Sequence, residues 1–67
     1  MITADELGRR IAAARKERGL ILAQLGYRTG RNITALSHIE NGDNFPSVPT
    51  LLLICKALGK TPDDFLL

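Results

Sequence analysis

Few side chains in this 67-residue chain could carry out chemistry. The sequence holds one histidine, His38, and one cysteine, Cys55. A metal site needs several ligands at suitable spacing, and a lone histidine with a distant cysteine does not provide them. Ser37 directly precedes His38, and neighbours on a helix face different ways, so they cannot serve one substrate as nucleophile and base. With no glycine-rich phosphate loop and no paired carboxylates, we expect no enzyme, no cofactor and no metal.

The composition favours a small helical protein. Hydrophobic residues make up 45% of the chain, but there is no Trp, one Tyr and only two Phe. The core must therefore consist of Leu, Ile, Val and Ala, which suits helices packed on helices. The length predicts one domain over residues 1–67. Because a single cysteine excludes an intrachain disulfide and no apolar run reaches the roughly 18 residues of a membrane span, we expect a cytoplasmic protein without membrane contact.

Charge is unevenly distributed along the chain. The net charge is +2, of which residues 1–36 carry +4 and residues 37–67 carry −2. A chain polarised in this way can turn one end towards a polyanion. A solvated, salt-bridged surface would explain the same distribution, so charge alone leaves both readings open.

Residues 19–42 predict two short helices joined by a tight turn. The first spans about residues 22–28 and contains Gly26, which costs about 1 kcal/mol relative to alanine and indicates that another element comes close. Gly30 is expected to take a positive φ in the turn, and a second helix follows over residues 33–40. Two short helices joined by a glycine turn form a helix-turn-helix, whose second helix can enter a DNA major groove.

The second of these helices has an inner and an outer face. Asn32 is a suitable N-cap, and Leu36 and Ile39 lie three residues apart on the inner face. The outer face then carries Ile33, Thr34, Ser37 and His38. Arg28 and Arg31 flank the turn and are candidates for phosphate contacts, with ordinary surface charge as the alternative.

Three further helices are expected around this pair. Thr3 and Glu6 predict a capping box, in which the hydroxyl and the carboxylate each accept a backbone N–H, at the start of a helix over residues 5–18. Another helix is expected between its cap and its glycine stop, within residues 47–59. Residues 61–64 have the cap, proline and acids of a last, short helix. The fold class is therefore all-α, with five helices.

The order of the expected helices, together with their caps and glycine stops, matches a known family in unbroken register. The matching residues are Ile11, Arg15, Gly19-Leu20, Leu25, Gly30, Leu36, Ile39–Gly42, Pro46-Ser47, Thr50-Leu51, Ile54, Lys56–Gly59 and Asp63–Phe65. Over about residues 7–65 the chain resembles the helix-turn-helix domain of the Cro and phage-repressor type, which includes xenobiotic-response-element regulators and related antitoxins. The resemblance implies a compact lambda-repressor-like bundle that binds double-stranded operator DNA as a homodimer and regulates transcription, as a repressor.

This resemblance also implies roles for individual residues. Residues 33–40 would form the recognition helix, and its base contacts would come from Ile33, Thr34, Ser37 and His38. Phosphates would be held by Asn41 and by the amide end of the preceding helix near Leu22. Arg15 and Glu40 stand at positions that pair in the family, and we interpret them as a structural ion pair.

The chain departs from the family pattern where the first short helix begins. The family usually has Ser or Thr followed by Gln, and here Ile21 and Leu22 stand in their places. That Gln commonly braces the first recognition side chain, whereas here Leu22 would meet Ile33. Ile33 cannot hydrogen-bond a base edge but could pack against a thymine methyl group.

Surplus apolar side chains near the C-terminus predict self-association. Leu53 stands where the family usually has a polar residue, and Leu66 and Leu67 add to the same region. A self-complementary apolar patch is what a two-fold dimer requires, so we place the homodimer interface there.

A second function remains open on the same fold. Ile21, Leu22 and Ile33 would form an apolar surface that could bind another protein. The chain would then be a protein-interaction module, such as an antitoxin that binds a toxin, and its binding to random DNA would be absent even at low salt.

Overall fold

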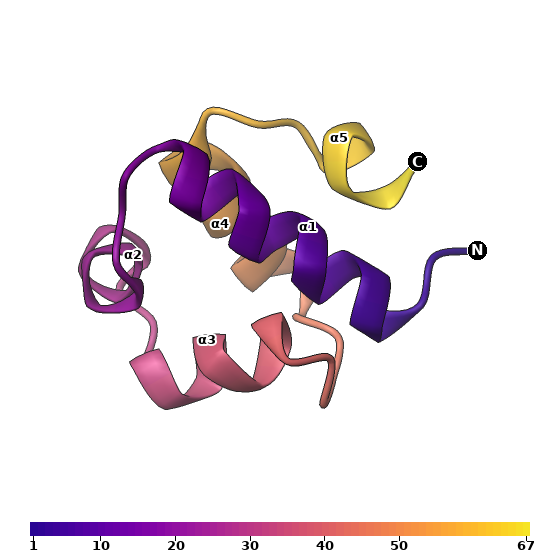
Figure 1. Ribbon diagram of the computed structural model, residues 1–67, viewed down its shortest axis with the longest axis horizontal. Coiled ribbons are helices and arrows are strands. Elements are labelled where there is room, and N and C mark those ends of the chain that lie inside the picture. The colour runs from indigo at the N-terminus through magenta and orange to yellow at the C-terminus, as the bar shows by residue number, and fades with distance from the viewer.

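Five helices form the computed structural model, which describes residues 1–67 (Figure 1). They are α1 (Ala4–Glu17), α2 (Leu22–Thr29), α3 (Ile33–Glu40), α4 (Val48–Leu58) and α5 (Pro62–Leu66). α1 contacts α3, α4 and α5, while α2 contacts α3 and α4. The all-α, five-helix arrangement expected from the sequence is confirmed. None of these helices combines the length and apolar character needed to cross a membrane.

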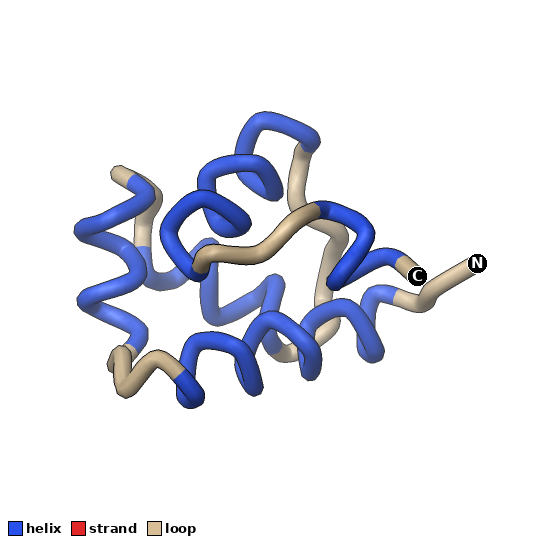
Figure 2. Tube along the Cα trace, turned by 90° about the horizontal axis from the view of Figure 1, so that it is seen from above, coloured by secondary structure: helices blue, strands red, loops and turns tan.

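Both chain ends lie in the same part of the molecule. Figures 1 and 2 both show the N- and C-termini at one end of the molecule, with α2 at the opposite end. α3 packs against α1 and against α2, which Figure 1 shows nearly end-on, and α5 lies on the other side of α1 in this view.

The core receives side chains from all five helices and from Leu20. It comprises Leu7, Ile11, Ala14, Leu20, Leu25, Leu36, Ile39, Leu51, Ile54, Cys55, Leu58 and Phe65. Both residues predicted on the inner face of the second short helix are in it. Burying a large aliphatic side chain stabilises the fold by about 1.5–3 kcal/mol. Desolvation, together with the nearby charge of Asp64, raises the pKa of the Cys55 thiol, which therefore stays protonated as a small apolar core group.

The start of α1 differs in part from the prediction. Thr3 Oγ1 accepts a hydrogen bond from the Glu6 amide at 3.1 Å, as expected of a cap. The Glu6 carboxylate, however, accepts from Arg10 Nη2 at 3.2 Å instead of the Thr3 amide, so the reciprocal half of the predicted capping box is wrong. α1 covers Ala4–Glu17 and not residues 5–18, because Arg18 adopts the C-cap position and its amide donates to carbonyls of the last turn.

α2 begins without a side-chain cap from Ile21, as predicted. Gln24 provides a side-chain acceptor at this helix start, since its Oε1 accepts a hydrogen bond from the Ile21 amide at 2.9 Å. The helix continues one residue beyond the predicted end, to Thr29, whose buried hydroxyl donates to the Leu25 carbonyl at 2.8 Å. Gly30 follows with φ of 67°, the left-handed conformation expected in the turn.

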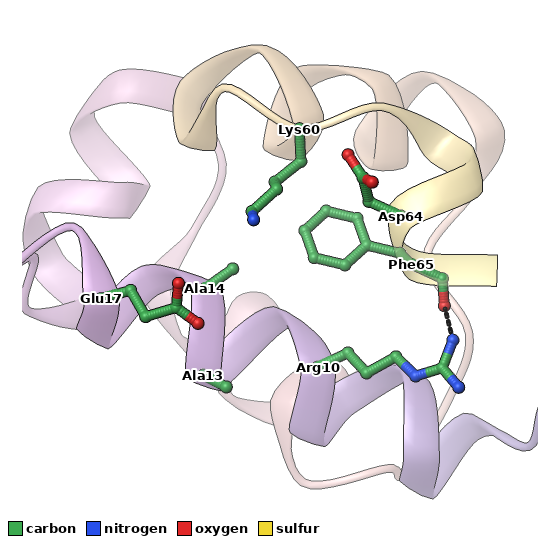
Figure 3. Close-up of a pocket in the computed structure, with 7 residues that line it drawn as sticks. All are labelled: Arg10, Ala13, Ala14, Glu17, Lys60, Asp64 and Phe65. Atoms are coloured by element: carbon green, nitrogen blue, oxygen red, sulfur yellow. Dashed lines mark hydrogen bonds between the residues drawn. The ribbon is translucent and has the colours of Figure 1, made fainter. Parts of the chain in front are cut away.

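Arg10 ties α5 to α1. Its Nη1 donates to the carbonyl oxygens of Phe65 at 3.0 Å and Leu67 at 2.8 Å, and Figure 3 shows the first of these bonds. These carbonyls lie at the end of α5, where no further helical turn provides a partner. The adjoining pocket of about 250 Å³ between α1 and α5 is lined by both signs of charge, including Glu17 and Lys60 (Figure 3).

Asp64 makes the start of α5 sensitive to acid. Its Oδ2 accepts from the Thr61 amide at 2.8 Å, and its own amide donates to Thr61 Oγ1 at 3.3 Å. These hydrogen bonds, first the backbone one, hold the pKa of Asp64 below its usual range. Because the folded-state pKa lies below the unfolded one, the stabilisation is present above the unfolded value and is lost as the pH falls below about 4.

We therefore expect the Tm of Asp64→Asn to fall less than that of the parent protein between about pH 5 and pH 2, because the variant cannot titrate at this position. Thermal unfolding followed by circular dichroism measures the decline. Asp63→Asn is the matched control, since Asp63 lies in the same turn and its side chain accepts no hydrogen bond. Identical acid profiles for the parent and Asp64→Asn would contradict the assignment.

Candidate nucleic-acid interface

The outer face of α3 is open to solvent. Ile33 is 48% exposed, Thr34 and His38 are exposed, and Ser37 is half-buried. Asn32 Oδ1 accepts from the Thr34 amide at 2.7 Å and so fixes the first turn of the helix, as the sequence predicted. The four residues expected on this face therefore share it, with Ser37 the least accessible.

His38 is paired within the chain. Its Nδ1 lies 2.7 Å from Asp43 Oδ2, and both side chains are more than half exposed. Because the carboxylate accepts, Nδ1 carries the proton and Nε2 is the ring atom left for another contact. Nε2 accepts a hydrogen bond in the neutral ring and donates one in the protonated ring. The contact also gives the Asp43 carboxylate, beside the exit of α3, a hydrogen-bond donor within the chain.

An ion pair holds the end of α3 against α1. Arg15 Nε donates to Glu40 Oε2 at 2.8 Å and Nη2 donates to Oε1 at 2.9 Å, with side chains only 12% and 9% exposed. Arg15 Nη1 also donates to the Leu20 carbonyl at 2.8 Å. The hydrogen bond to Glu40 raises the pKa of Arg15, against a smaller opposing effect of burial. The pairing expected from the sequence is present, and it joins α1, the loop before α2 and the last residue of α3.

The backbones of α1 and α3 also touch. A side chain at Gly8 would collide with the carbonyl oxygens of Ile39 and Glu40. The close approach predicted at Gly26 is confirmed as well: a Cβ there would lie 3.1 Å from the Arg31 carbonyl oxygen and 3.6 Å from Ile33 Cγ2. Glycines in α1 and α2 thus allow α3 and its leading residues to pack directly onto both helices.

Two arginines lie where α2 passes into α3. Arg28 is exposed and its guanidinium makes no hydrogen bond within the chain, whereas Arg31 is half-buried. Arg31 Nε donates to Thr50 Oγ1 at 3.0 Å, and the same hydroxyl accepts from Ser47 Oγ at 3.0 Å. α4 therefore orients Arg31 and leaves the two terminal nitrogens of its guanidinium unpaired.

Further donors lie at the ends of the two helices. The amides of Leu22 and Ala23, the first in α2, have no acceptor in the chain, while the Leu22 side chain packs against the core. Asn41 at the exit of α3 is exposed, with Nδ2 3.5 Å from Ser37 Oγ. Free amides at a helix start favour an anion through their orientation and the helix dipole.

Sequence reasoning missed two contacts and one side chain at this surface. Asp43 orients His38 and Thr50 holds Arg31, but both contacts join different elements and have no local signal. Tyr27 is exposed and lines a shallow hollow on α2. Its position could have been inferred, because it lies two residues from the inward Leu25 and so on the far side of the helix.

The apolar surface near the chain ends differs from the prediction at one position. A groove of about 410 Å³ is lined by Met1, Ile2, Leu7, Phe45, Pro46, Val48, Leu51, Leu66 and Leu67. Leu66 and Leu67 line it as expected, but Leu53 is half-buried and does not. The open leucine of α4 is Leu52, which is 51% exposed. The helical rotation of 100° per residue separates these neighbours, and the structure favours Leu52 as the accessible one.

No cluster of three or more His, Cys, Asp or Glu side chains is placed to hold a metal ion. The chemical groups gathered on the outer face of α3 are instead methyls, hydroxyls and one imidazole, with arginines and free amides beside them.

The family model for the helix-turn-helix domain matches residues 6–66. The chain belongs to this helix-turn-helix family. In this helix-turn-helix domain, α2 and α3 are the two helices of the motif and Gly30 lies in its turn. Among curated proteins, no sequence matches the chain.

Solved structures share the fold over nearly the whole domain. The restriction-modification controller protein C.AhdI from Aeromonas hydrophila superimposes with a TM-score of 0.90 at 22% identity, over 94% of this chain and 96% of that one. The clp gene regulator ClgR from C. glutamicum gives 0.88 at 27% identity, over 98% and 86%. A point mutant of the restriction-modification controller protein C.Esp1396I gives 0.84 at 26% identity, over 97% and 84%. The helix-turn-helix domain described here thus has the fold of DNA-binding transcription regulators.

Proposed function

We propose that this helix-turn-helix protein is a transcription repressor that binds operator DNA as a homodimer and inserts α3 into the major groove. The observation that carries the proposal is the exposed outer face of α3 in a chain of this family. The similarity to regulators such as ClgR supports the same reading.

Base contacts come from the outer face of α3 in this proposal. Thr34 and Ser37 offer hydroxyls that can donate or accept, and His38 offers Nε2, while Ile33 offers an apolar contact. The ion pair of Arg15 with Glu40 supports this role, because a recognition helix must keep a fixed orientation while it lies in the major groove.

Phosphate contacts come from the edges of the motif. Arg28, Arg31 and Asn41 supply side-chain donors, and the free amides beginning at Leu22 supply backbone donors. Such contacts fix the register of a protein on the duplex without reading sequence. The link from Arg31 to Thr50 supports its assignment, because a held guanidinium loses less conformational freedom on binding.

Dimerisation uses the apolar groove at the chain ends. Leu66 and Leu67 form its open part, and the exposed fraction of Leu53 together with Leu52 extends the apolar surface along α4. A pseudo-palindromic operator requires a two-fold axis that sets the two α3 helices about one helical turn apart, and the proposal places that axis at the groove. Residues 1–67 act as one DNA-binding domain in this proposal, in the cytoplasm where the operator lies.

One observation favours a second function. Ile21 is 64% exposed at the start of α2, and the exposed part of Ile33 is also apolar, which suits a protein partner as well as a base edge. The comparisons give no support for a toxin as that partner.

A titration separates the two functions. Fluorescence anisotropy of a labelled random-sequence duplex is measured with the purified protein at about 50 and 200 mM salt. A regulator of this kind is expected to bind at the lower salt and to lose affinity steeply at the higher one. No binding at about 50 mM salt would contradict the proposal and favour the protein-interaction module.

The two arginines are expected to act alike on all sequences. Arg28→Ala and Arg31→Ala should each reduce the slope of log Kd against log salt by about 1, because each removes one phosphate contact. Lys56→Ala, which removes an equal charge from the exposed surface of α4, should leave the slope unchanged.

His38→Ala should instead change which sequences are enriched from a random duplex library. A uniform loss across sequences in His38→Ala would contradict base reading by that residue.

A further inference from the structure

The first turn of α3 lacks the side chains that usually read purines. Ile33, Thr34 and Ala35 are consecutive and exposed, and each ends in methyl groups or carries one. Arg, Lys, Asn and Gln make the bidentate hydrogen bonds that distinguish guanine and adenine. None of these residue types occurs between Ile33 and Ile39, so the first turn of α3 presents mainly methyl groups to a binding partner.

Ile33 is held in place. Its Cγ2 lies over Gly26, 3.6 Å from the point where a Cβ would stand, while 48% of the residue remains exposed. A β-branched side chain has little freedom about χ1, and this contact reduces it further. The exposed half is therefore a fixed apolar projection at the end of α3 that contacts bases in helix-turn-helix proteins.

Only one feature of the major groove suits such a projection. The C5-methyl group of thymine is the apolar element displayed there, and methylation of cytosine at C5 places a methyl group on the same ring position. The other edges are hydrogen-bonding atoms, and covering them with an aliphatic side chain removes their water without replacing it. The positive charge of Arg28 and Arg31 beside α3 favours DNA over an apolar protein as the occupant.

We propose that the first turn of α3, led by Ile33, reads the C5-methyl groups of pyrimidines, so that operator binding responds both to thymine and to cytosine methylation. This inference rests on the proposed function and names the base feature that the same surface recognises. Transfer of one methyl group out of water corresponds to about fourfold in affinity, and the two half-sites of a dimer would give about fifteenfold together.

The test uses an operator enriched from a random duplex library by the parent protein. The enriched duplex is made again with deoxyuridine in place of each thymidine in turn, and with 5-methylcytosine in place of each cytosine. We expect one or two adjacent positions in each half-site where loss of the methyl group weakens binding about fourfold, or where its addition to cytosine strengthens binding by a similar factor. Equal Kd values for all of these duplexes would overturn the inference.

Variants test whether Ile33 is the reader. Ile33→Val keeps the branch over Gly26 and shortens the side chain, and Ile33→Ala removes it; both should reduce the methyl effect towards onefold. Lys56→Ala, on the exposed surface of α4 and outside the candidate interface, is the control and should retain the full effect. An undiminished effect in both Ile33 variants would overturn the assignment, and circular dichroism establishes that they are folded. The comparison of duplexes with the parent protein does not depend on any variant.

Failure of the proposed function is distinguishable from failure of this inference. If no duplex is bound at low salt, operator binding is wrong and methyl reading falls with it. If an operator is enriched but its Kd ignores every C5-methyl group, operator binding stands and only methyl reading is wrong.

Discussion

Glu40→Ala is expected to lower the free energy of unfolding by about 3–5 kcal/mol, because it leaves the buried guanidinium of Arg15 without its partner. Both side chains are nearly covered, at 12% and 9% exposure, and two hydrogen bonds join them. A domain of this size has only about 5 kcal/mol to lose, so the variant should be largely unfolded at 37 °C. Urea unfolding followed by circular dichroism at 10 °C, where some structure should persist, measures the difference.

Glu6→Ala is the matched control for this experiment. It also removes the carboxylate of an arginine pair, but Glu6 and Arg10 are 48% and 34% exposed and lie one helical turn apart. Exposed pairs of this kind contribute about 0.5 kcal/mol or less. If Glu40→Ala cost no more than Glu6→Ala, the pair could not be what holds α3 to α1.

Gly8→Ala is expected to destabilise the fold by about 2 kcal/mol or more, although alanine is the better helix former by about 1 kcal/mol. The added methyl group would meet the carbonyl oxygens of Ile39 and Glu40, which belong to the backbone and can move only if α3 moves. The same variant should weaken DNA binding more than its loss of stability explains, because displacement of α3 changes the angle of the reading face. Chemical unfolding and anisotropy titration measure the two effects on the same samples.

Gly26→Ala provides a graded comparison. A Cβ at Gly26 would lie 3.1 Å from the Arg31 carbonyl oxygen, a contact that a shift of a few tenths of an ångström relieves. We expect a change within about 1 kcal/mol, since the strain and the gain in helix propensity oppose each other. Equal stabilities for Gly8→Ala and the parent protein would show that α1 and α3 are not in backbone contact.

Local chemistry was sufficient to predict most helix boundaries. α3 has the predicted span because Asn32 caps its start and Gly42, with φ of 82°, prevents its continuation. α5 begins at Pro62 because Thr61 caps it and proline suits the first turn. These signals act between residues only a few positions apart, so they can be recognised in the sequence alone.

The errors arose where a side chain had a choice of partners. Glu6 could accept from the Thr3 amide or from Arg10, and the structure has it paired with Arg10. Gly8 lies inside α1 and, like Gly26 in α2, could have indicated a close approach, but that α3 is the element that approaches depends on the folded arrangement. The same holds for the candidate interface: its outer-face residues follow from helical periodicity, while the contacts of His38 with Asp43 and of Arg31 with Thr50 follow only from the folded arrangement.

The central claim, that the outer face of α3 meets DNA, can be tested directly by NMR. Amide spectra of the 15N-labelled protein are recorded as a duplex enriched from a random library is added. Chemical shift changes are expected to concentrate on Ile33–His38, at Arg28 and Arg31, and at the first amides of α2, with little change along α5. Changes centred on the apolar groove at the chain ends, with α3 unaffected, would contradict the claim.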